Sequence, residues 1–381
     1  MKLVIEARSL SGPGGGIQTY TRELISYLLK EPGKYDVTVL YSDKRQESIF
    51  PAAHGEVVPL HAEAFLPFWL NQQVPKALNR LQPDIVHFTK ADVPVHKRFP
   101  TIVTIHDVIP LLLPNMQSPL RRLYWPRALQ RAASQSDHIL TISEASKRGI
   151  IEHLHVNPHK ITVTPLGINH DHFKPVEQES VRRILRLYNI TGPYILFVGT
   201  RDARKNIAAL LRAFARIQNQ IPHTVVIAGR AADKRDDTEH LVGELQLESR
   251  VRILGKVGYE DLPALYTAAD IFVWPSIYEG WGFPPLEAMA CGTPVITSDG
   301  GALPEAVGQE GIIVPFSEGT VASRLQDKDF VQRLSEEILR VLQDRALRDS
   351  LIQQGQRHAM QFSWPPVIQK TLAVYDRVAV L

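Results

Sequence analysis

Residues 270–290 read DIFVWPSIYEGWGFPPLEAMA and contain three consecutive structural signals. The apolar run Ile271–Trp274 predicts a buried strand. A glycine-containing loop follows it, and Pro284 and Pro285 are typical of the first turn of a helix. The start of a helix in this position presents unpaired backbone N–H groups and the positive end of the helix dipole. We therefore expect a binding site for a diphosphate at this strand-to-helix junction.

Two glutamates flank this junction with seven residues between them. Glu279 lies in the predicted loop, where it can accept a hydrogen bond from a sugar hydroxyl. Glu287 is expected in the first helical turn, with its carboxylate directed back to accept hydrogen bonds from a ribose diol. In this strand, loop and proline context, the two acids resemble the E-x7-E signature of family 4, the retaining group 1 glycosyltransferases of GT-B fold.

Size and composition agree with that resemblance. The chain has 381 residues, too many for one hydrophobic core and suited to two domains. Its one cysteine, Cys291, excludes an intrachain disulfide and a multi-cysteine metal site, and favours a reducing compartment. A net charge of +3 without a basic stripe interleaved with aromatics argues against binding to nucleic acid.

The N-terminal residues lack the apolar length of a signal peptide, and no apolar run approaches the roughly 18 residues of a membrane span. We therefore expect a cytoplasmic protein. Residues 118–131 combine arginines with Trp125, Tyr124 and leucines, which favours peripheral contact with an anionic membrane surface. The alternative is a helix packed on its own domain, and Pro126 is expected to interrupt a continuous amphipathic face.

Short apolar runs alternate with helical patterns, which predicts parallel α/β sheets covered on both faces. The runs of the first half are 3–5, 37–41, 85–88, 101–105, 138–142 and 161–164. Those of the second half are 194–198, 224–228, 251–254, 271–274, 294–297 and 311–314.

A turn-rich segment bounded by Pro165 and Pro175 separates the two sets of runs and indicates a hinge. We predict a Rossmann-like acceptor-side domain at 1–170 and a Rossmann-like nucleotide-sugar-binding domain at 171–361. Residues 330–361 are expected to form a long helical stretch, and 362–381 to form a helix, from residue 367, that returns to the first domain. The resemblance implies the GT-B architecture, in which two such domains face one another across a deep cleft.

Polar and glycine residues follow most of the predicted strands, where ligands of open α/β sheets bind. Gly14, Gly15 and Gly16 follow the first strand and can let backbone N–H groups approach a phosphate or sugar. By resemblance, the donor nucleotide, phosphates and sugar are bound by a further set of residues. These are Thr200, Arg204, Lys205, Arg230, Val257, Glu279, Gly282, Phe283, Leu286 and Glu287.

Arg204 and Lys205 precede a predicted helix at Ile207, with Asn206 as its expected N-cap. Cations are unfavourable at a helix start, so two adjacent ones indicate that an anion binds there, although a solvated helix terminus is the alternative. Thr200 occupies the position where relatives place an arginine, and whether Arg201 replaces that arginine stays open.

His106 follows a buried strand and, by resemblance, lies beside the donor sugar. There it would hydrogen-bond the sugar or support developing charge. His87 is interpreted as a packing residue. The predicted catalytic set is therefore His106, Glu279, Lys205 and Arg204.

The resemblance implies transfer of a hexose from a nucleotide diphosphate sugar, of the UDP-glucose or GDP-mannose type, with retention of configuration. The acceptor would be a saccharide or lipid-linked saccharide in the synthesis of a bacterial cell-surface polysaccharide. No metal or other cofactor is expected, because protein cations stabilise the leaving diphosphate. The alternatives are a GT-B sugar-nucleotide epimerase, a glycogen-type phosphorylase and a non-catalytic nucleotide-sugar-binding subunit.

Overall fold

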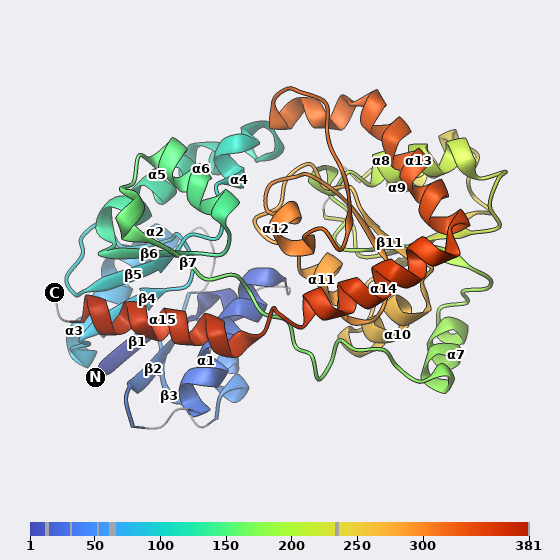
Figure 1. The fold of residues 1–381 in the computed structure, drawn as a ribbon. Coiled ribbons are helices and arrows are strands. Elements are labelled where there is room, and N and C mark those ends of the chain that lie inside the picture. The colour runs from blue at the N-terminus through green and yellow to red at the C-terminus, as the bar shows by residue number, and fades with distance from the viewer. Residues whose placement is uncertain (12–14, 31–32, 52, 61–65, 233–235, 380–381) are drawn as a thin grey trace. The chain divides into compact units, whose positions relative to one another are not determined.

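The chain is described by a computed structural model that covers residues 1–11, 15–30, 33–51, 53–60, 66–232 and 236–379. It forms two compact α/β units (Figure 1). Unit 1 comprises Met1–Leu166 and Trp364–Leu381, and unit 2 comprises Gly167–Ser363. The C-terminal segment of the chain thus belongs to the same unit as its N-terminus.

The described strands of unit 1 form a seven-stranded parallel sheet in the order β3-β2-β1-β4-β5-β6-β7. They are β1 (Lys2–Glu6), β2 (Asp36–Tyr41), β3 (His54–Val57), β4 (Ile85–Phe88), β5 (Thr101–Thr104), β6 (His138–Thr141) and β7 (Ile161–Val163). The apolar runs predict all of them except β3. This edge strand pairs only with β2, and its sequence, His-Gly-Glu-Val, contains no apolar run that could have revealed it.

The described strands of unit 2 form a six-stranded parallel sheet in the order β10-β9-β8-β11-β12-β13. They are β8 (Tyr194–Val198), β9 (Thr224–Ala228), β10 (Val251–Gly255), β11 (Ile271–Trp274), β12 (Val295–Ser298) and β13 (Ile312–Val314). Every one of them lies on a predicted apolar run. Two parallel sheets with helices confirm the α/β expectation.

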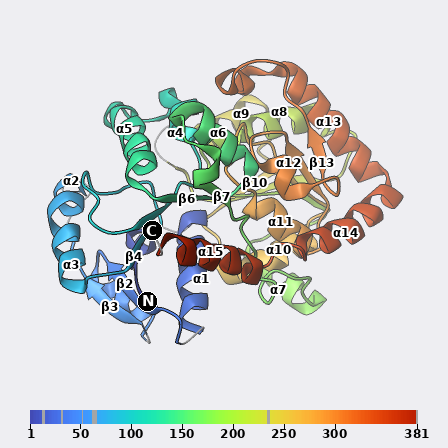
Figure 2. The same ribbon diagram turned by 60° about the vertical axis from the view of Figure 1, so that its left-hand side comes forward.

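Helices cover these sheets, as the two views in Figures 1 and 2 show. Those of unit 1 are α1 (Gly16–Lys30), α2 (Leu66–Phe68), α3 (Val74–Leu81), α4 (Ile109–Leu112), α5 (Pro119–Gln135), α6 (Glu144–Leu154) and α15 (Trp364–Val378). Those of unit 2 are α7 (Gln178–Leu187), α8 (Ile207–Ile217), α9 (Thr238–Glu244), α10 (Leu262–Ala268), α11 (Phe283–Ala290), α12 (Leu303–Val307), α13 (Lys328–Gln343) and α14 (Arg345–Ala359).

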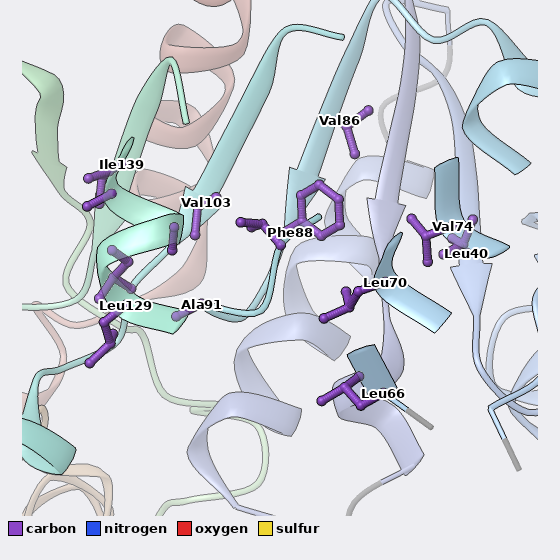
Figure 3. Close-up of a cluster of buried hydrophobic side chains, with 14 of the residues drawn as sticks. Leu40, Leu66, Leu70, Val74, Val86, Phe88, Ala91, Val103, Leu129 and Ile139 are labelled. Carbon is purple, nitrogen blue, oxygen red and sulfur yellow. The ribbon is translucent and has the colours of Figure 1, made fainter. Parts of the chain in front are cut away.

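Alternate residues of the unit 1 strands build two different faces. Val86, Phe88 and Val103 point into a hydrophobic cluster that includes Val74 of α3 and Leu129 of α5 (Figure 3). Burial of this continuous apolar surface from several elements is the main stabilising term for the unit. The face with α3 and α5 is therefore an ordinary hydrophobic core.

The opposite face of the same sheet carries buried polar residues that bind α15. His87 of β4 is fully buried, with Nδ1 2.6 Å from the Tyr375 hydroxyl and Nε2 2.8 Å from the Thr104 hydroxyl. Asp376 accepts hydrogen bonds from Lys34 and from the Tyr35 hydroxyl, both at 2.7 Å. The interpretation of His87 as a packing residue agrees with these contacts.

Two helix predictions are wrong in detail, and Pro126 does not break its helix. The stretch 330–361 is two helices rather than one, because Asp344 interrupts it and accepts a hydrogen bond from the Leu347 amide as the N-cap of α14. Helix α5 continues through Pro126, which was expected to interrupt its amphipathic face. The final helix begins at Trp364, because Pro365 and Pro366 fit the first turn of a helix.

Asn206 occupies the predicted N-cap position of α8, but it does not cap the helix with its side chain. Its backbone is left-handed, with φ 54°, and its side chain makes no capping hydrogen bond. Instead, Asp202 accepts a hydrogen bond from the Arg204 amide and caps a short 3₁₀ turn, η7 (Ala203–Lys205). Lys205 is therefore the last residue of this 3₁₀ turn, and α8 begins after it at Ile207.

In each sheet the strand order reverses at one point. The chain continues from one of the two neighbouring strands toward one edge of the sheet, and from the other strand toward the opposite edge. In unit 2 this point lies between β8 and β11. Ligands of open α/β sheets bind outside the carboxyl ends of the strands at such a point. The loops that follow β8 and β11 are therefore where the fold favours a site.

Candidate active site

The loops after β8 and β11 bring three predicted site residues into direct contact. Lys205 Nζ lies 2.6 Å from Oε1 of Glu279, and Arg204 NH1 lies 2.7 Å from Oε2 of the same carboxylate. Arg204 also donates a hydrogen bond of 2.7 Å to the Tyr278 carbonyl. Lys205 and Glu279, which are 74 positions apart in the sequence, thus belong to one cluster with two cations and one anion.

The protonation states in this cluster follow from burial and charge. Burial alone would raise the pKa of the Glu279 carboxyl, but the adjacent Arg204 and Lys205 outweigh it and lower that pKa to about 2. Burial, together with repulsion from Arg204, lowers the pKa of Lys205, and Glu279 opposes this shift. With Glu279 ionised and both cations charged, the three side chains carry a net charge of +1, which favours an anionic ligand.

The backbone around Glu279 is held by a pair of glycines after β12. The Glu279 amide donates to the Gly300 carbonyl at 3.2 Å, and the Ala302 amide donates to the Glu279 carbonyl at 2.9 Å. A Cβ on Gly301, whose φ is 65°, would lie 2.3 Å from that same Glu279 carbonyl oxygen. The glycines therefore permit the close approach that fixes the Glu279 loop.

The start of α11 has fewer backbone N–H groups available to a ligand than expected. Pro284 and Pro285 have no N–H, and the Leu286 amide donates to the Gly282 carbonyl at 3.1 Å. The amides near the helix start that are suited to phosphate are therefore those of Gly282 and Phe283. Gly282 is itself required, since a Cβ there would lie 2.8 Å from Cβ of Ala306.

Glu287 lies in the second turn of α11, not in the first as predicted, because the helix begins at Phe283. Its Oε2 accepts a hydrogen bond of 2.9 Å from the hydroxyl of Tyr266 on α10. Burial raises the pKa of the Glu287 carboxyl to about 7, although the Tyr266 hydrogen bond opposes that shift. The Glu287 carboxyl ionises near neutrality and accepts one hydrogen bond from Tyr266. Its oxygens can therefore still accept hydrogen bonds from the diol of a ligand.

Replacing Glu287 with glutamine is expected to stabilise the protein at pH 8 and to weaken nucleotide binding about tenfold. A folded-state pKa of about 7, above the ordinary 4.5, means that the wild-type protein loses stability as pH rises through this interval. Discounted for partial exposure, the gain for Glu287→Gln is about 2 kcal/mol at pH 8 and nearly disappears near pH 4.5. Urea unfolding at both pH values and titration with UDP or GDP measure the two effects, and an equal stability change at both would contradict the prediction.

The other predicted donor-site residues of unit 2 lie at the carboxyl edge of its sheet or on α11. Thr200 follows β8, Arg230 is exposed after β9, and Val257 is partly exposed after β10. Phe283 opens α11, and Leu286 is fully buried on it. Only Arg204, Lys205 and Glu279 among the predicted residues are linked by the ion pairs described above.

Arg201 is engaged elsewhere. Its Nε lies 2.6 Å from Oδ2 of Asp236, and its NH2 lies 3.5 Å from Oε1 of Glu239. The side chains of Arg201 and Asp236 are both largely buried. These contacts direct the guanidinium toward Asp236, so they do not favour Arg201 as a replacement for the arginine that the resemblance implies at position 200.

The predicted residues of unit 1 lie at the carboxyl edge of its own sheet. His106 is buried after β5, and its Nε2 donates to the Thr89 carbonyl at 3.0 Å. Burial lowers the pKa of His106 to about 4, so the imidazole is neutral near pH 7. Gly15, with φ 120°, precedes α1, and Gly16 is its first residue, whereas Gly14 lies outside the described residues.

Sequence reasoning missed several side chains that make buried polar or cation–π contacts in the two units. Trp274, the last residue of β11, places its ring 4.5 Å from Lys205 Nζ. Tyr266 binds Glu287, and in unit 1 a buried ion pair joins Arg8 to Asp92, which also accepts from the Tyr124 hydroxyl. An aromatic residue at a strand end is a signal that could have indicated Trp274, whereas nothing in the sequence distinguishes Tyr266 or Asp92.

Among the described residues, no group of three or more His, Cys, Asp or Glu side chains is arranged to hold a metal ion. Within the same residues, no helix combines the length and apolar character needed to span a bilayer.

Comparison with known families identifies both units. Residues 183–358 match the sequence model of the glycosyl transferases group 1, and residues 14–172 match that of glycosyltransferase family 4. The chain belongs to the group 1 glycosyltransferases. This glycosyltransferase is 29% identical, over 98% of its length and 99% of the relative's, to the O-antigen chain mannosyltransferase B of Escherichia coli.

Solved structures confirm the GT-B fold of this glycosyltransferase. The sucrose-phosphate synthase of Thermosynechococcus elongatus superposes with a TM-score of 0.78 at 22% identity, covering 99% of this chain and 98% of that one. HepE of Anabaena, solved with UDP and glucose, superposes with a TM-score of 0.75 at 20% identity over the whole of both chains. At these identities the likeness establishes the fold and not the substrate.

Proposed function

We propose that this glycosyltransferase transfers a hexose from a nucleotide diphosphate sugar to a saccharide or lipid-linked saccharide, with retention of configuration. The pathway is the synthesis of a bacterial cell-surface polysaccharide. The observation that carries the proposal is the cluster of Arg204, Lys205 and Glu279, a net positive group at the point in the unit 2 sheet that favours ligands. A full-length relative that is an O-antigen chain mannosyltransferase supports the pathway.

In the proposed mechanism, Lys205 and Arg204 neutralise the charge that develops on the leaving diphosphate. Both ammonium and guanidinium are already fixed by Glu279, so little reorganisation is needed as the glycosidic bond breaks. The amides of Gly282 and Phe283 supply further donors toward the phosphates. These protein groups perform the electrostatic role, and the proposed reaction is therefore metal-independent.

Other residues are assigned to the nucleotide and the sugar. Glu287 accepts hydrogen bonds from the ribose diol in its ionised form. Glu279 offers its carboxylate to a donor-sugar hydroxyl when the diphosphate takes over part of the cation contacts. His106, neutral near pH 7, contributes hydrogen bonds to the sugar and no positive charge. Front-face attack and a covalent intermediate are both compatible with these roles.

Calorimetric titration with UDP, GDP and ADP tests the donor assignment. We expect GDP to bind most tightly, because the full-length relative is a mannosyltransferase and GDP-mannose is one of the two donors inferred from the sequence. Transfer from GDP-mannose and from UDP-glucose to a saccharide acceptor is then measured. If the protein binds none of the three nucleotides, the proposal is contradicted. Conversion of the donor sugar without acceptor would indicate an epimerase, and binding without transfer would indicate a non-catalytic subunit.

Peripheral membrane contact through residues 118–131 is part of the same proposal. Helix α5 contains no acidic residue, and Leu120 and Leu123 near its start are 83% and 61% exposed. Its arginines are Arg121, Arg122, Arg127 and Arg131. Arginine attracts anionic headgroups, and exposed leucines enter the interface. Co-sedimentation with vesicles that contain or lack anionic lipid tests this contact.

A further inference from the structure

Lys205 is held on two sides, by a carboxylate and by an aromatic ring. Its Nζ lies 2.6 Å from Oε1 of Glu279 and 4.5 Å from the centroid of the Trp274 ring. An ammonium over an aromatic face is attracted by the ring quadrupole, and indole gives the strongest such attraction among the aromatic side chains. The ring of Trp274 is thus a second, uncharged partner for the same cation.

The Trp274 ring is fixed in place by its own neighbours. It stacks on Phe197 of β8 with ring centroids 4.8 Å apart and planes 18° apart, and it is almost completely buried. A Cβ on Gly199 would lie 2.5 Å from Cη2 of Trp274, so the glycine after β8 leaves room for the indole. Strand β8 therefore provides both the stacking surface and the space for this ring.

A hydrogen bond does not explain why tryptophan occupies this position. The indole Nε1–H is buried and has no hydrogen-bond partner among the described residues. A buried donor without a partner is unfavourable, and phenylalanine or leucine would avoid that penalty. The contact that distinguishes an indole here is the one with the Lys205 ammonium.

An aromatic partner suits a cation that must bind an anionic ligand. A second carboxylate would also hold the ammonium, but its charge would repel an incoming diphosphate. The π face carries no net charge, so it orients Lys205 without that repulsion. The charged groups that also act on Lys205 are Arg204 and Asp202 from the loop after β8 and Glu279 from the loop after β11.

We propose that Trp274 is a positioning residue that holds the Lys205 ammonium, charged and correctly directed, for the diphosphate of the donor. The inference rests on the proposed function, and it adds a residue to which neither the sequence motif nor the family comparison assigns a role. Trp274 acts through Lys205 and is not itself assigned a contact with the donor. Its loss should therefore change how Lys205 ionises and binds, beyond any loss of packing.

The test compares Trp274→Leu, Trp274→Phe and Phe330→Leu in the full chain, with UDP and GDP as probes. Phe330→Leu removes a fully buried ring of α13 in the same unit, one that stacks on Phe316 rather than on Trp274, so it serves as the packing control. We expect Trp274→Leu to weaken nucleoside diphosphate binding about tenfold at pH 7.5 and Trp274→Phe to restore most of it. The alkaline loss of binding should begin at lower pH in Trp274→Leu, since the aromatic face no longer favours the charged lysine.

The outcomes separate this inference from the proposed function. If Lys205→Met weakens binding and Trp274→Leu behaves like Phe330→Leu with an unchanged alkaline limb, the role of Trp274 is overturned and the function stands. If Lys205→Met binds UDP and GDP as the wild type does, the assignment of Lys205 to the bound diphosphate fails, and the role of Trp274 fails with it. If the wild-type protein binds none of UDP, GDP and ADP, the proposed function itself fails. In the double variant, Trp274→Leu should add no further loss to Lys205→Met, because the two changes remove one interaction.

Discussion

Replacing Lys205 with methionine is expected to lower kcat for sugar transfer by about 100- to 1,000-fold. The charge on the leaving diphosphate grows as the glycosidic bond breaks, so a fixed ammonium acts more strongly on the transition state than on the bound donor. Methionine keeps most of the side-chain volume, and Arg204 remains paired with Glu279 at 2.7 Å, so the loop after β8 should keep its structure. Steady-state transfer from the donor that binds in the titration measures the effect.

Lys256 provides the matched control for this variant. It is a lysine of the same unit, it follows β10, and it is exposed. Lys256→Met should leave kcat within a factor of about two, as is usual for a surface change of this kind. Wild-type turnover in Lys205→Met, with normal thermal unfolding, would remove Lys205 from the catalytic set.

Replacing Glu279 with glutamine is expected to reduce the free energy of unfolding by about 3 kcal/mol at pH 7. The change leaves two cations, Arg204 and Lys205, close together in a largely buried cluster without their shared anion. The folded-state pKa of Glu279 is lowered to about 2 from the ordinary 4.5. The stability that it contributes is therefore present above about pH 4.5 and is lost as pH falls toward 2.

The same variant should respond more strongly to anions than the wild type. Pyrophosphate or a nucleoside diphosphate supplies the missing negative charge, so the rise in Tm on adding either should be larger in Glu279→Gln. Glu248→Gln, a change at an exposed acid of the same unit, is the control and should alter neither stability nor the response. Chemical denaturation from pH 5 to 8 and thermal shifts with and without pyrophosphate provide the measurements. A stability equal to that of the wild type at pH 7 would contradict the assigned charge pairing.

The strands and the α/β class could be predicted because buried parallel strands are short apolar runs in the sequence, whereas the GT-B fold was implied by the resemblance of the Glu279 and Glu287 motif to its family. Edge strand β3 could not, since His54–Val57 lies beside one neighbour and needs no such run. The break at Asp344 has a local cause, because an aspartate that caps a new helix looks like any polar residue within a long helical pattern. Helix continuity through Pro126 depends on packing that no local preference describes.

The candidate site was predictable as a set of residue types and not as a set of contacts. Glu279, Arg204 and Lys205 were each indicated by their place after a strand. Their pairing depends on β8 and β11 being neighbours in the sheet, which a single sequence does not show. The same limit applies to Tyr266 and Trp274, whose partners are distant along the chain. The turn that holds Glu287 was misjudged because the helix begins at Phe283, one residue before the prolines.

The position of α15 determines the order in which the chain can mature on the ribosome. Unit 2 is contained in Gly167–Ser363, so its sequence is complete before Trp364 is synthesised. Unit 1, although translated first, lacks Tyr375 and its contact with His87 until α15 is synthesised. The part of its sheet that α15 covers, around β5 and β6, therefore stays uncovered while unit 2 is being translated. The half of the enzyme that is made first is the half that is finished last.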